Sequence, residues 1–296
     1  MYEELLEGTY DLHVHPGPDV SPRKLDDLEY AERARKLGIK GFGIKSHYFC
    51  TAERARLVHK LYPDVHPLGA VVLNNAVGGI NPAAVEMAAR DGAKLVWMPT
   101  FDSENEIQYL FNNTGYEELP PWAKVQLERK EQGKAQAGLS VLEEGVISPK
   151  THEVLDLIAE NNMVLSTGHL SKVEIFELVK SAREHKITKI LVTHPTFSSI
   201  ALSKEEQKQL VELGAMMDEC YGCITPGYGT TWENIYEQIR FLGPENCVLS
   251  SDLGQVNNPY PDEGLVMFVT NLIQNGFTKT EITTMTAVNT SLLAEE

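Results

Sequence analysis

The sequence predicts an α/β protein of the (β/α)8 barrel (TIM barrel) class, and two observations support that prediction. Eight short apolar runs alternate with amphipathic helical stretches along most of the 296 residues. Strands that alternate with helices pair in parallel through right-handed crossovers, and eight such units in about 250 residues match the size of a closed barrel. An open, doubly wound sheet is the second choice, weakened because no GxGxxG pattern follows the first run. We therefore expect residues 1–296 to form a single barrel domain.

The predicted strands and helices follow one another regularly. The strands cover residues 9–15, 39–47, 66–74, 93–100, 163–169, 189–194, 215–221 and 247–252, and the clearest helical stretches are 25–38, 81–92, 151–162 and 172–185. A hydroxyl residue followed three residues later by Glu predicts a helix start, and this pattern begins at Ser171, Ser203, Thr230 and Thr278. Glycines at 38, 92, 214 and 276 are placed to end helices.

Residues 101–150 interrupt this alternation because they are too many for an ordinary strand-to-helix loop. The segment mixes polar residues with the aromatic residues Tyr109, Phe111, Tyr116 and Trp122. It follows the fourth strand, so it lies on the face where barrel enzymes carry their active sites. We expect an inserted lid or substrate wall there, with a hairpin that only packs as the alternative.

Charge and composition narrow the class of partner. The formal net charge of −16 disfavours nucleic acids and anionic membrane surfaces, both of which attract basic proteins. No apolar run approaches the roughly 20 residues that a membrane-spanning helix needs. The acidic N-terminus enters a strand pattern almost at once, unlike a signal peptide. We expect a cytoplasmic protein with a small-molecule substrate, and a homo-oligomer is the base-rate expectation for its assembly.

The four cysteines include one CxxC pair. A cytosolic protein keeps Cys50, Cys220, Cys223 and Cys247 reduced. Cys220 and Cys223 are spaced like a redox pair or half of a zinc site, but no second CxxC accompanies them. We interpret the pair as packing at the end of a strand.

The positions of the nine histidines indicate a functional site. His59, His152 and His185 fall in helical patterns and His66 opens a strand, so these four are expected at the surface or in packing. The other five, and one aspartate, each end an apolar run just before a turn: His13, His15, His47, His169, His194 and Asp252. The C-terminal ends of barrel strands converge on one mouth, where barrel enzymes do their chemistry. We therefore expect these six side chains to meet.

His13 and His15 lie two residues apart on one strand, so both imidazoles face the same way. Converging imidazole nitrogens are typical ligands of zinc, iron, nickel or manganese. A bare HxH recurs by chance, but His169, His194 and Asp252 occupy the same end position on later strands. The pattern predicts one or two divalent metal ions, zinc first, with manganese, iron, nickel or cobalt as alternatives.

The order of these residues resembles the amidohydrolase superfamily. The matching elements are HxH (His13 and His15) on strand 1, His169 on strand 5, His194 on strand 6 and Asp252 on strand 8, together with a closing AVNTSLLAEE. Among its branches the phosphotriesterase-like, TatD-like and decarboxylase-like ones are the most similar. The resemblance implies a metal-dependent hydrolase, in which activated water attacks a C–N, C–O or P–O bond. It implies that Asp252 both ligates a metal and accepts the proton of that water.

One departure from the superfamily concerns the bridging ligand. Members with two metals usually carry a carbamylated Lys or a Glu at the end of strand 4, where this chain reads WMPT. Lys45, at the end of strand 2, is the substitute we predict, carbamylated as a metal ligand. The alternatives are that Lys45 is a cation that pairs with an anionic substrate, or that it forms a structural ion pair. His47, on the same side of that strand, is predicted to contact substrate or metal, with packing as the alternative.

Two other functions remain open at this stage. A decarboxylase of the same superfamily with one metal would use Lys45 to hold a carboxylate. A non-catalytic barrel would bind a metal or a small ligand without turnover, although Asp252 is unnecessary for binding alone. A TatD-like nuclease is disfavoured by the acidic charge.

Overall fold

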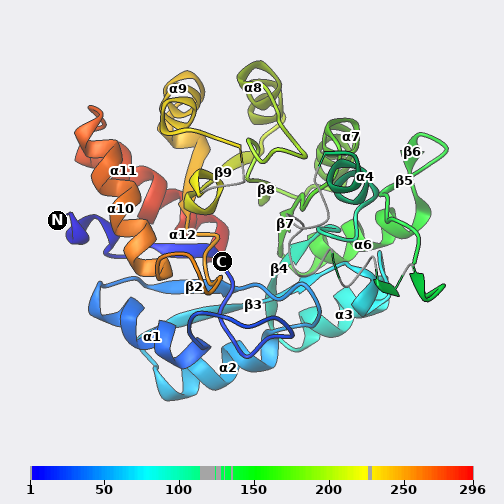
Figure 1. The fold of residues 1–296 in the computed structure, drawn as a ribbon, viewed down its shortest axis with the longest axis horizontal. Coiled ribbons are helices and arrows are strands. Elements are labelled where there is room, and N and C mark those ends of the chain that lie inside the picture. The colour runs from blue at the N-terminus through cyan, green and yellow to red at the C-terminus, as the bar shows by residue number, and fades with distance from the viewer. Residues whose placement is uncertain are drawn as a thin grey trace.

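The eight predicted strands all form, and they pair in parallel in the order β1-β2-β3-β4-β7-β8-β9-β10, as Figure 1 shows. The computed structural model describes residues 2–113, 124, 128–129, 131–134, 136–225 and 229–295. The strands are β1 Tyr10–Val14, β2 Gly41–Ile44, β3 His66–Val72, β4 Ala93–Trp97, β7 Val164–Ser166, β8 Ile190–Thr193, β9 Met216–Cys220 and β10 Cys247–Ser250. The predicted (β/α)8 barrel is confirmed.

A helix follows each strand, and most of these helices pack outside the barrel. These helices are α1 Asp27–Lys36, α2 Ala52–Leu61, α3 Pro82–Arg90, α4 Glu104–Asn113, α6 Pro149–Glu160, α7 Lys172–Glu184, α8 Lys204–Glu212, α9 Trp232–Leu242 and α10 Pro261–Gln274, followed by α11 Lys279–Thr283 and α12 Asn289–Ala294. None of the described helices is long and apolar enough to cross a bilayer.

Capping chemistry sets most helix starts. Ser171, Ser203 and Thr278 each form the predicted capping box with the Glu three residues on. The prediction at Thr230 is wrong by one residue, because the hydroxyl of Thr231 accepts from the backbone N–H of Asn234 instead. Asp26 makes a further capping box with Glu29, which the predicted pattern of a hydroxyl residue followed by Glu does not include.

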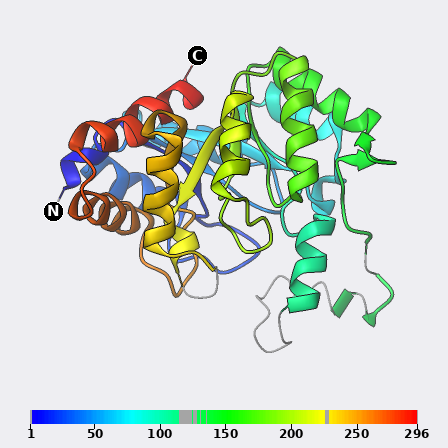
Figure 2. The same cartoon turned by 90° about the horizontal axis from the view of Figure 1, so that it is seen from above.

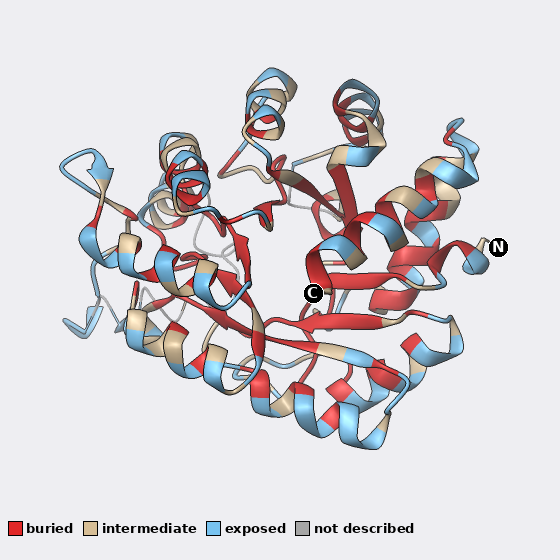
Figure 3. Ribbon diagram, turned by 180° about the vertical axis from the view of Figure 1, so that it is seen from behind, coloured by how far each residue is buried: buried red, intermediate tan, exposed pale blue. Residues whose placement is uncertain are grey.

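The apolar core has two layers, and Figure 3 shows their burial along the strands and the inner faces of the helices. One layer lies between the strands and the helices. The other fills the barrel interior, where Tyr10, Leu12, Trp97 and Val248 meet, and it includes Leu293 of α12. Because side chains fill the interior, the barrel is a packed core and its chemistry is confined to the strand ends.

The barrel closes between its first and last strands at the point where the predicted ligands lie. The backbone N–H of Asp252 donates to the carbonyl of His13 at 2.7 Å, and the N–H of His15 donates to the carbonyl of Leu253 at 2.8 Å. These bonds surround a single parallel bridge between Val14 and Leu253. The seam β1–β10, as we call these three contacts, therefore joins the start of the barrel to its end.

An irregularity in β1 directs its histidines inward. The register of the β1–β2 pair shifts between Asp11 and Val14. Leu12 packs in the interior cluster, whereas Val14 packs in the outer layer. The carboxylate of Asp11 accepts a hydrogen bond from the hydroxyl of Tyr30 on α1 at 2.8 Å. Asp11 therefore serves the helix layer, although strict alternation would put it on the same face as His13.

The segment 101–150 leaves the barrel after β4 and returns to it at α6. It contains α4 and a short antiparallel hairpin made of β5 Leu142–Glu143 and β6 Val146–Ile147. A parallel bridge between Ser103 and Leu139 draws its two ends together. Figure 2 shows α4 extending away from the barrel at the end where the strands terminate. Tyr116 and Trp122, on which the prediction of a lid partly rests, lie outside the described residues.

Glu219 on β9 is buried among apolar side chains. Neither of its carboxyl oxygens has a hydrogen-bond partner among the described residues. It alternates with Asp218, which faces the interior, and so it faces the layer where Met217 and Leu249 pack. Burial, with a smaller contribution from Asp218, raises the pKa of Glu219 to about 8.

We predict that Glu219 makes the protein less stable as pH rises. In the unfolded chain this carboxyl ionises near its ordinary pKa of 4.5, whereas the folded protein keeps it protonated up to about pH 8. The unfolded state therefore loses the proton first, and stability falls across that window. Thermal melts of Glu219→Gln and the parent between pH 5 and 8 should diverge as pH rises, with the variant more stable at pH 8. Glu205→Gln, an exposed change on α8, is the control, and parallel melting curves for Glu219→Gln would contradict the prediction.

Candidate metal centre

The seven residues predicted from the strand ends meet at the C-terminal mouth of the barrel. They are His13, His15, Lys45, His47, His169, His194 and Asp252, contributed by β1, β2, β7, β8 and β10 or the residues just beyond them. The imidazoles form a continuous series of contacts. The ring centroids of His15 and His47 are 4.8 Å apart, those of His13 and His15 5.4 Å, those of His13 and His194 5.6 Å, and those of His169 and His194 4.8 Å.

Three of these groups come within coordination distance of one another. Asp252 Oδ1 lies 3.0 Å from His13 Nε2 and 3.1 Å from His15 Nε2. The side chain of His13 is fully buried, whereas that of Asp252 is 16% exposed. Asp252 is therefore the member of this trio that solvent or a substrate reaches.

The opposite nitrogens of the two histidines fix their tautomers. His13 Nδ1 lies 3.0 Å from Asp218 Oδ2, and His15 Nδ1 lies 3.0 Å from the backbone carbonyl of Lys45. A carboxylate and a carbonyl both accept, so Nδ1 of each ring carries the hydrogen. When the rings are neutral, both Nε2 lone pairs face the same carboxylate oxygen. Such a set of acceptors calls for a positive group: Lys45 Nζ, 2.8 Å from His13 Nε2, supplies one when it is protonated, and a proton or a metal ion would supply another.

The electrostatics of the trio agree with a cation position. Burial alone would lower the pKa of His13, but Asp252 and Asp218 outweigh burial and raise it. Burial would likewise raise the pKa of Asp252, but His13 and His15 hold it well below its usual range. Burial lowers the pKa of His15 to about 3, which keeps that ring neutral and able to coordinate.

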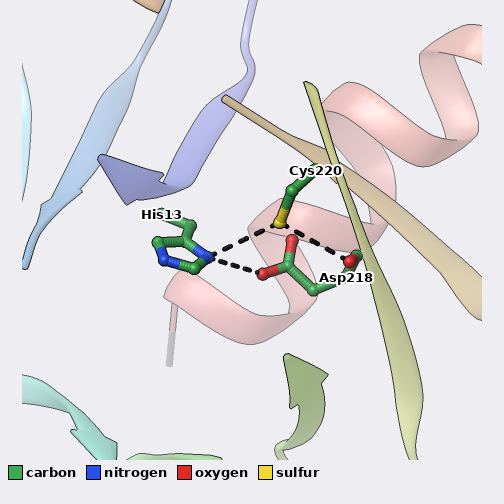
Figure 4. Close-up of side chains that lie close together, drawn as sticks. All are labelled: His13, Asp218 and Cys220. Carbon is green, nitrogen blue, oxygen red and sulfur yellow. Dashed lines mark hydrogen bonds and ion pairs between the residues drawn. The ribbon is translucent and has the colours of Figure 1, made fainter. Parts of the chain in front are cut away.

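Figure 4 shows a second group of possible metal ligands, made of His13, Asp218 and Cys220, on the Nδ1 side of the His13 ring. The thiol of Cys220 lies 3.6 Å from His13 Nδ1. Since Nδ1 donates its hydrogen to Asp218, it has no lone pair left for a metal in this arrangement. Ser250 Oγ donates to the other oxygen of Asp218 and helps to hold the carboxylate. We therefore interpret Asp218 as the group that orients His13.

Lys45 is buried beside His13. Its amine lies 2.8 Å from His13 Nε2 and 5.1 Å from the centre of the Trp97 ring. Burial lowers the pKa of Lys45 to about 8, although Asp252 counteracts burial. A substantial fraction of neutral amine is therefore present near pH 8.

His169 and His194 provide buried nitrogens without hydrogen-bond partners. Nδ1 of each ring is buried, and neither makes a hydrogen bond with any described residue. His194 has φ +26° and Asp252 has φ +47°, which are left-handed conformations that cost non-glycine residues energy. Strained backbone at two of the predicted ligands is typical of a functional site.

His47 borders the same space on the side of β2. Its Nδ1 lies 2.8 Å from the hydroxyl of Thr100, and its ring stacks on His15 and contacts Phe101. Asn74 also donates to that hydroxyl at 2.8 Å. Burial, with Lys45, lowers the pKa of His47 well below 6.5, so the ring is neutral at physiological pH.

The residues at the mouth fit a divalent cation. The donor set combines imidazole nitrogens with a carboxylate, as zinc, manganese and iron prefer. His13, His15 and Asp252 present acceptors to one point, and His169 and His194 add buried rings whose Nδ1 atoms make no hydrogen bond with any described residue. The other four histidines make separate contacts, such as His59 Nδ1 with the carbonyl of Val65 and His152 with His185.

The pattern of polar residues at strand ends did not predict Asp218, which lies within β9. Asp218 and Glu219 are the two charged residues of the seventh predicted strand, and a charged pair inside a strand was the available signal. Cys220 and Cys223 are predicted to pack at the end of a strand, and the structure places the Cys220 thiol 3.6 Å from His13 Nδ1 and against Cys223. Both cysteines are reduced and buried.

The loop that carries His169 depends on a glycine. Gly168 has φ +63°, and a Cβ built there would lie 2.4 Å from the carbonyl oxygen of Met98. The chain after β7 therefore approaches the end of β4 more closely than any residue with a side chain allows.

We predict that Gly168→Ala destabilises the protein more than a change at an equivalent but open glycine. Gly92 has φ +95°, and a Cβ at that position would have no atom within 4 Å, so Gly92→Ala measures conformational strain alone, about 1 kcal/mol. Gly168→Ala adds a backbone clash and should exceed that cost by at least about 1–3 kcal/mol in denaturant unfolding. If both variants lost the same free energy of unfolding, the backbone around Gly168 would be able to move and accept a side chain, which would contradict the prediction.

Comparison with known proteins gives one family and a common architecture. The model of a family described as "Family of unknown function (DUF6282)" matches residues 8–218. No curated protein sequence matches the chain significantly.

Several solved structures share the fold over almost their whole length. A probable 2-pyrone-4,6-dicarboxylic acid hydrolase of Acinetobacter baumannii, solved with citric acid bound, is 12% identical, with 97% of this chain and 99% of that one covered and a TM-score of 0.60. The probable dipeptidase PvdM of Pseudomonas aeruginosa is 10% identical, with 99% and 96% covered and a TM-score of 0.61. A 2,6-dihydroxybenzoate decarboxylase of Rhizobium is 12% identical, with 97% and 98% covered and a TM-score of 0.56. These matches, which also include an amidohydrolase of Pseudomonas aeruginosa, confirm the predicted resemblance at the level of the fold.

Proposed function

The chain belongs to DUF6282, a family of unknown function, and we propose that it is a metal-dependent hydrolase that acts on a C–N, C–O or P–O bond of a small molecule. The observation that supports this most is the convergence of His13 Nε2 and His15 Nε2 on Asp252 Oδ1 while both Nδ1 atoms are held by acceptors. His13, His15, His169, His194 and Asp252 would hold one or two divalent ions, zinc first. A cation there would lower the pKa of a water molecule and polarise the scissile carbonyl or phosphoryl group.

Asp252 is the proposed general base. His13 and His15 hold its pKa well below the usual range, so the carboxylate is ionised and able to accept a proton from the attacking water. Both close contacts to histidine use Oδ1, which leaves Oδ2 for that proton. The partly exposed carboxyl would then pass the proton to the leaving group. His47, neutral and beside His15, is proposed to contact the substrate.

Asp252→Asn should reduce turnover about 10²–10⁴-fold, because the amide cannot accept the proton of the water. Most of the metal should remain bound, since the four histidines are unchanged. The measurements are metal content by elemental analysis and rates on a panel of esters, amides, lactones and phosphate esters. Near-normal turnover in the variant would remove Asp252 from the mechanism. A parent protein that binds metal tightly but turns over nothing in the panel would favour a non-catalytic binding barrel.

Lys45 is proposed to be carbamylated when two metals are bound. Its buried amine lies among the proposed ligands, and a neutral amine adds CO2 to form N–COO⁻ with release of one proton. The carboxylate so formed would supply the bridging ligand that the end of β4 lacks. The alternatives, a cation for an anionic substrate or a structural ion pair, leave the amine free.

Carbon NMR distinguishes these states of Lys45. Protein incubated with ¹³C-bicarbonate and zinc should give one slow-exchanging carbamate signal and bind about two metal ions per chain. The signal should disappear in Lys45→Met and persist in Lys40→Met, whose lysine is half-exposed and paired with Glu295. Absence of the signal in metal-loaded protein would rule out carbamylation.

A decarboxylase with one metal is the second candidate. It is favoured by the buried Lys45 cation beside the proposed metal ligands, which could hold a substrate carboxylate, and by the structural likeness to the Rhizobium decarboxylase. The two candidates differ in metal count, because a single ion with an uncarbamylated Lys45 is what decarboxylation requires. For either reaction we propose that the segment 101–150 forms a lid or wall over the substrate, since α4 begins at the mouth.

A further inference from the structure

The first turn of α4 holds the loop that carries His169. Ser103 Oγ donates to the backbone carbonyl of His169 at 2.8 Å, and the amide of Asn105 donates to the same carbonyl at 3.1 Å. Asn105 also donates to the carbonyl of Ser199, in the loop after β8, at 2.9 Å. The start of the insertion therefore joins two loops that each follow a strand bearing a proposed ligand.

Glu106 directs a buried carboxylate toward His169 from this turn. The residue is 1% exposed, and its Oε2 accepts a hydrogen bond from the hydroxyl of Ser199. The same oxygen lies 3.4 Å from His169 Nδ1. That distance is within reach of an ion pair, but the angles do not make a hydrogen bond, and Nδ1 is otherwise without a partner among the described residues.

The other side of the mouth shows what such a carboxylate does. Asp218 accepts from Nδ1 of His13, and the carbonyl of Lys45 accepts from Nδ1 of His15, so the Nε2 atoms of both rings face Asp252 Oδ1. Glu106 Oε2 lies beside the same ring nitrogen of His169, at the longer distance of 3.4 Å. Contacts of this kind are often long in a ligand-free site and shorten when the site is filled.

We propose that Glu106 is a positioning residue that accepts the hydrogen of His169 Nδ1 and so presents Nε2 of that ring to the metal. The proposal rests on the proposed function, because it assumes that His169 is a ligand. A carboxylate on the far nitrogen orients the ring and makes the coordinating nitrogen more basic. The insertion would then contribute to metal affinity in addition to any role over the substrate.

The tautomer of His169 tests the proposal without metal. In apoprotein at pH 8, nitrogen NMR of ¹⁵N-histidine-labelled protein should show His169 protonated on Nδ1, with the signal assigned by its loss in His169→Gln. Glu106→Ala should convert it to a mixture of tautomers, and the isosteric Glu106→Gln should keep the fold if the alanine variant does not. A parent protein with His169 protonated on Nε2 would overturn the proposal, whatever the variants do.

Metal affinity gives the second readout. Competition with a chromophoric chelator should show zinc binding weakened about 10–100-fold in Glu106→Ala and less in Glu106→Gln. Glu104→Gln, the same chemical change on the exposed side of the same turn, should bind like the parent. Ser199→Ala should also bind nearly like the parent, and an equal loss there would mean that Glu106 acts only through the loop, which contradicts the proposal.

The two proposals fail differently. A parent protein that binds no zinc removes the metal-dependent hydrolase, whatever the state of Glu106. A parent that binds zinc, with unchanged affinity and unchanged His169 tautomer in both Glu106 variants, removes only the role of Glu106.

Discussion

The seam β1–β10 is the constraint on which the site depends. Two backbone hydrogen bonds and one bridge close the barrel there, and their donors and acceptors belong to His13, His15, Asp252 and Leu253. The left-handed conformation of Asp252 lets its N–H reach the carbonyl of His13 while its carboxylate turns toward both Nε2 atoms. The contacts that close the sheet therefore also bring His13 Nε2, His15 Nε2 and Asp252 Oδ1 together. These three acceptors would repel one another in isolation, and the packing energy of the barrel offsets that repulsion.

Beside that seam, His13 and His15 are held by hydrogen bonds at their Nδ1 atoms. Asp218 and the carbonyl of Lys45 occupy the Nδ1 atoms of His13 and His15, and Ser250 in turn steadies Asp218. These supporting groups come from β9, β10 and the end of β2, so the site is built into rigid strands and not only into loops. In each ring Nδ1 is held by a hydrogen bond and Nε2 faces Asp252. The hydrogen bond limits rotation of the ring, which would otherwise turn Nε2 away from a metal ion.

The sequence predicted the barrel and the convergence of seven side chains because both depend on local order. Alternating strands and helices determine the topology, and a polar residue at the end of an apolar run lies at the mouth whatever its neighbours. The supporting residues could not be found in this way, since Asp218 meets His13 across 205 positions and Glu106 lies in an insertion without barrel periodicity. Strict alternation also fails at β1, where the register shift lets Leu12 and His13 both face inward.

Because the residues that close the barrel come from its first and its last strand, they are separated by nearly the whole length of the chain. Closing so long a loop costs conformational entropy, which the contacts at the seam must offset. During synthesis β1 is made long before β10, so a growing chain lacks Asp252. A chain truncated before β10 would have an open sheet and would lack the carboxylate that contacts His13 and His15.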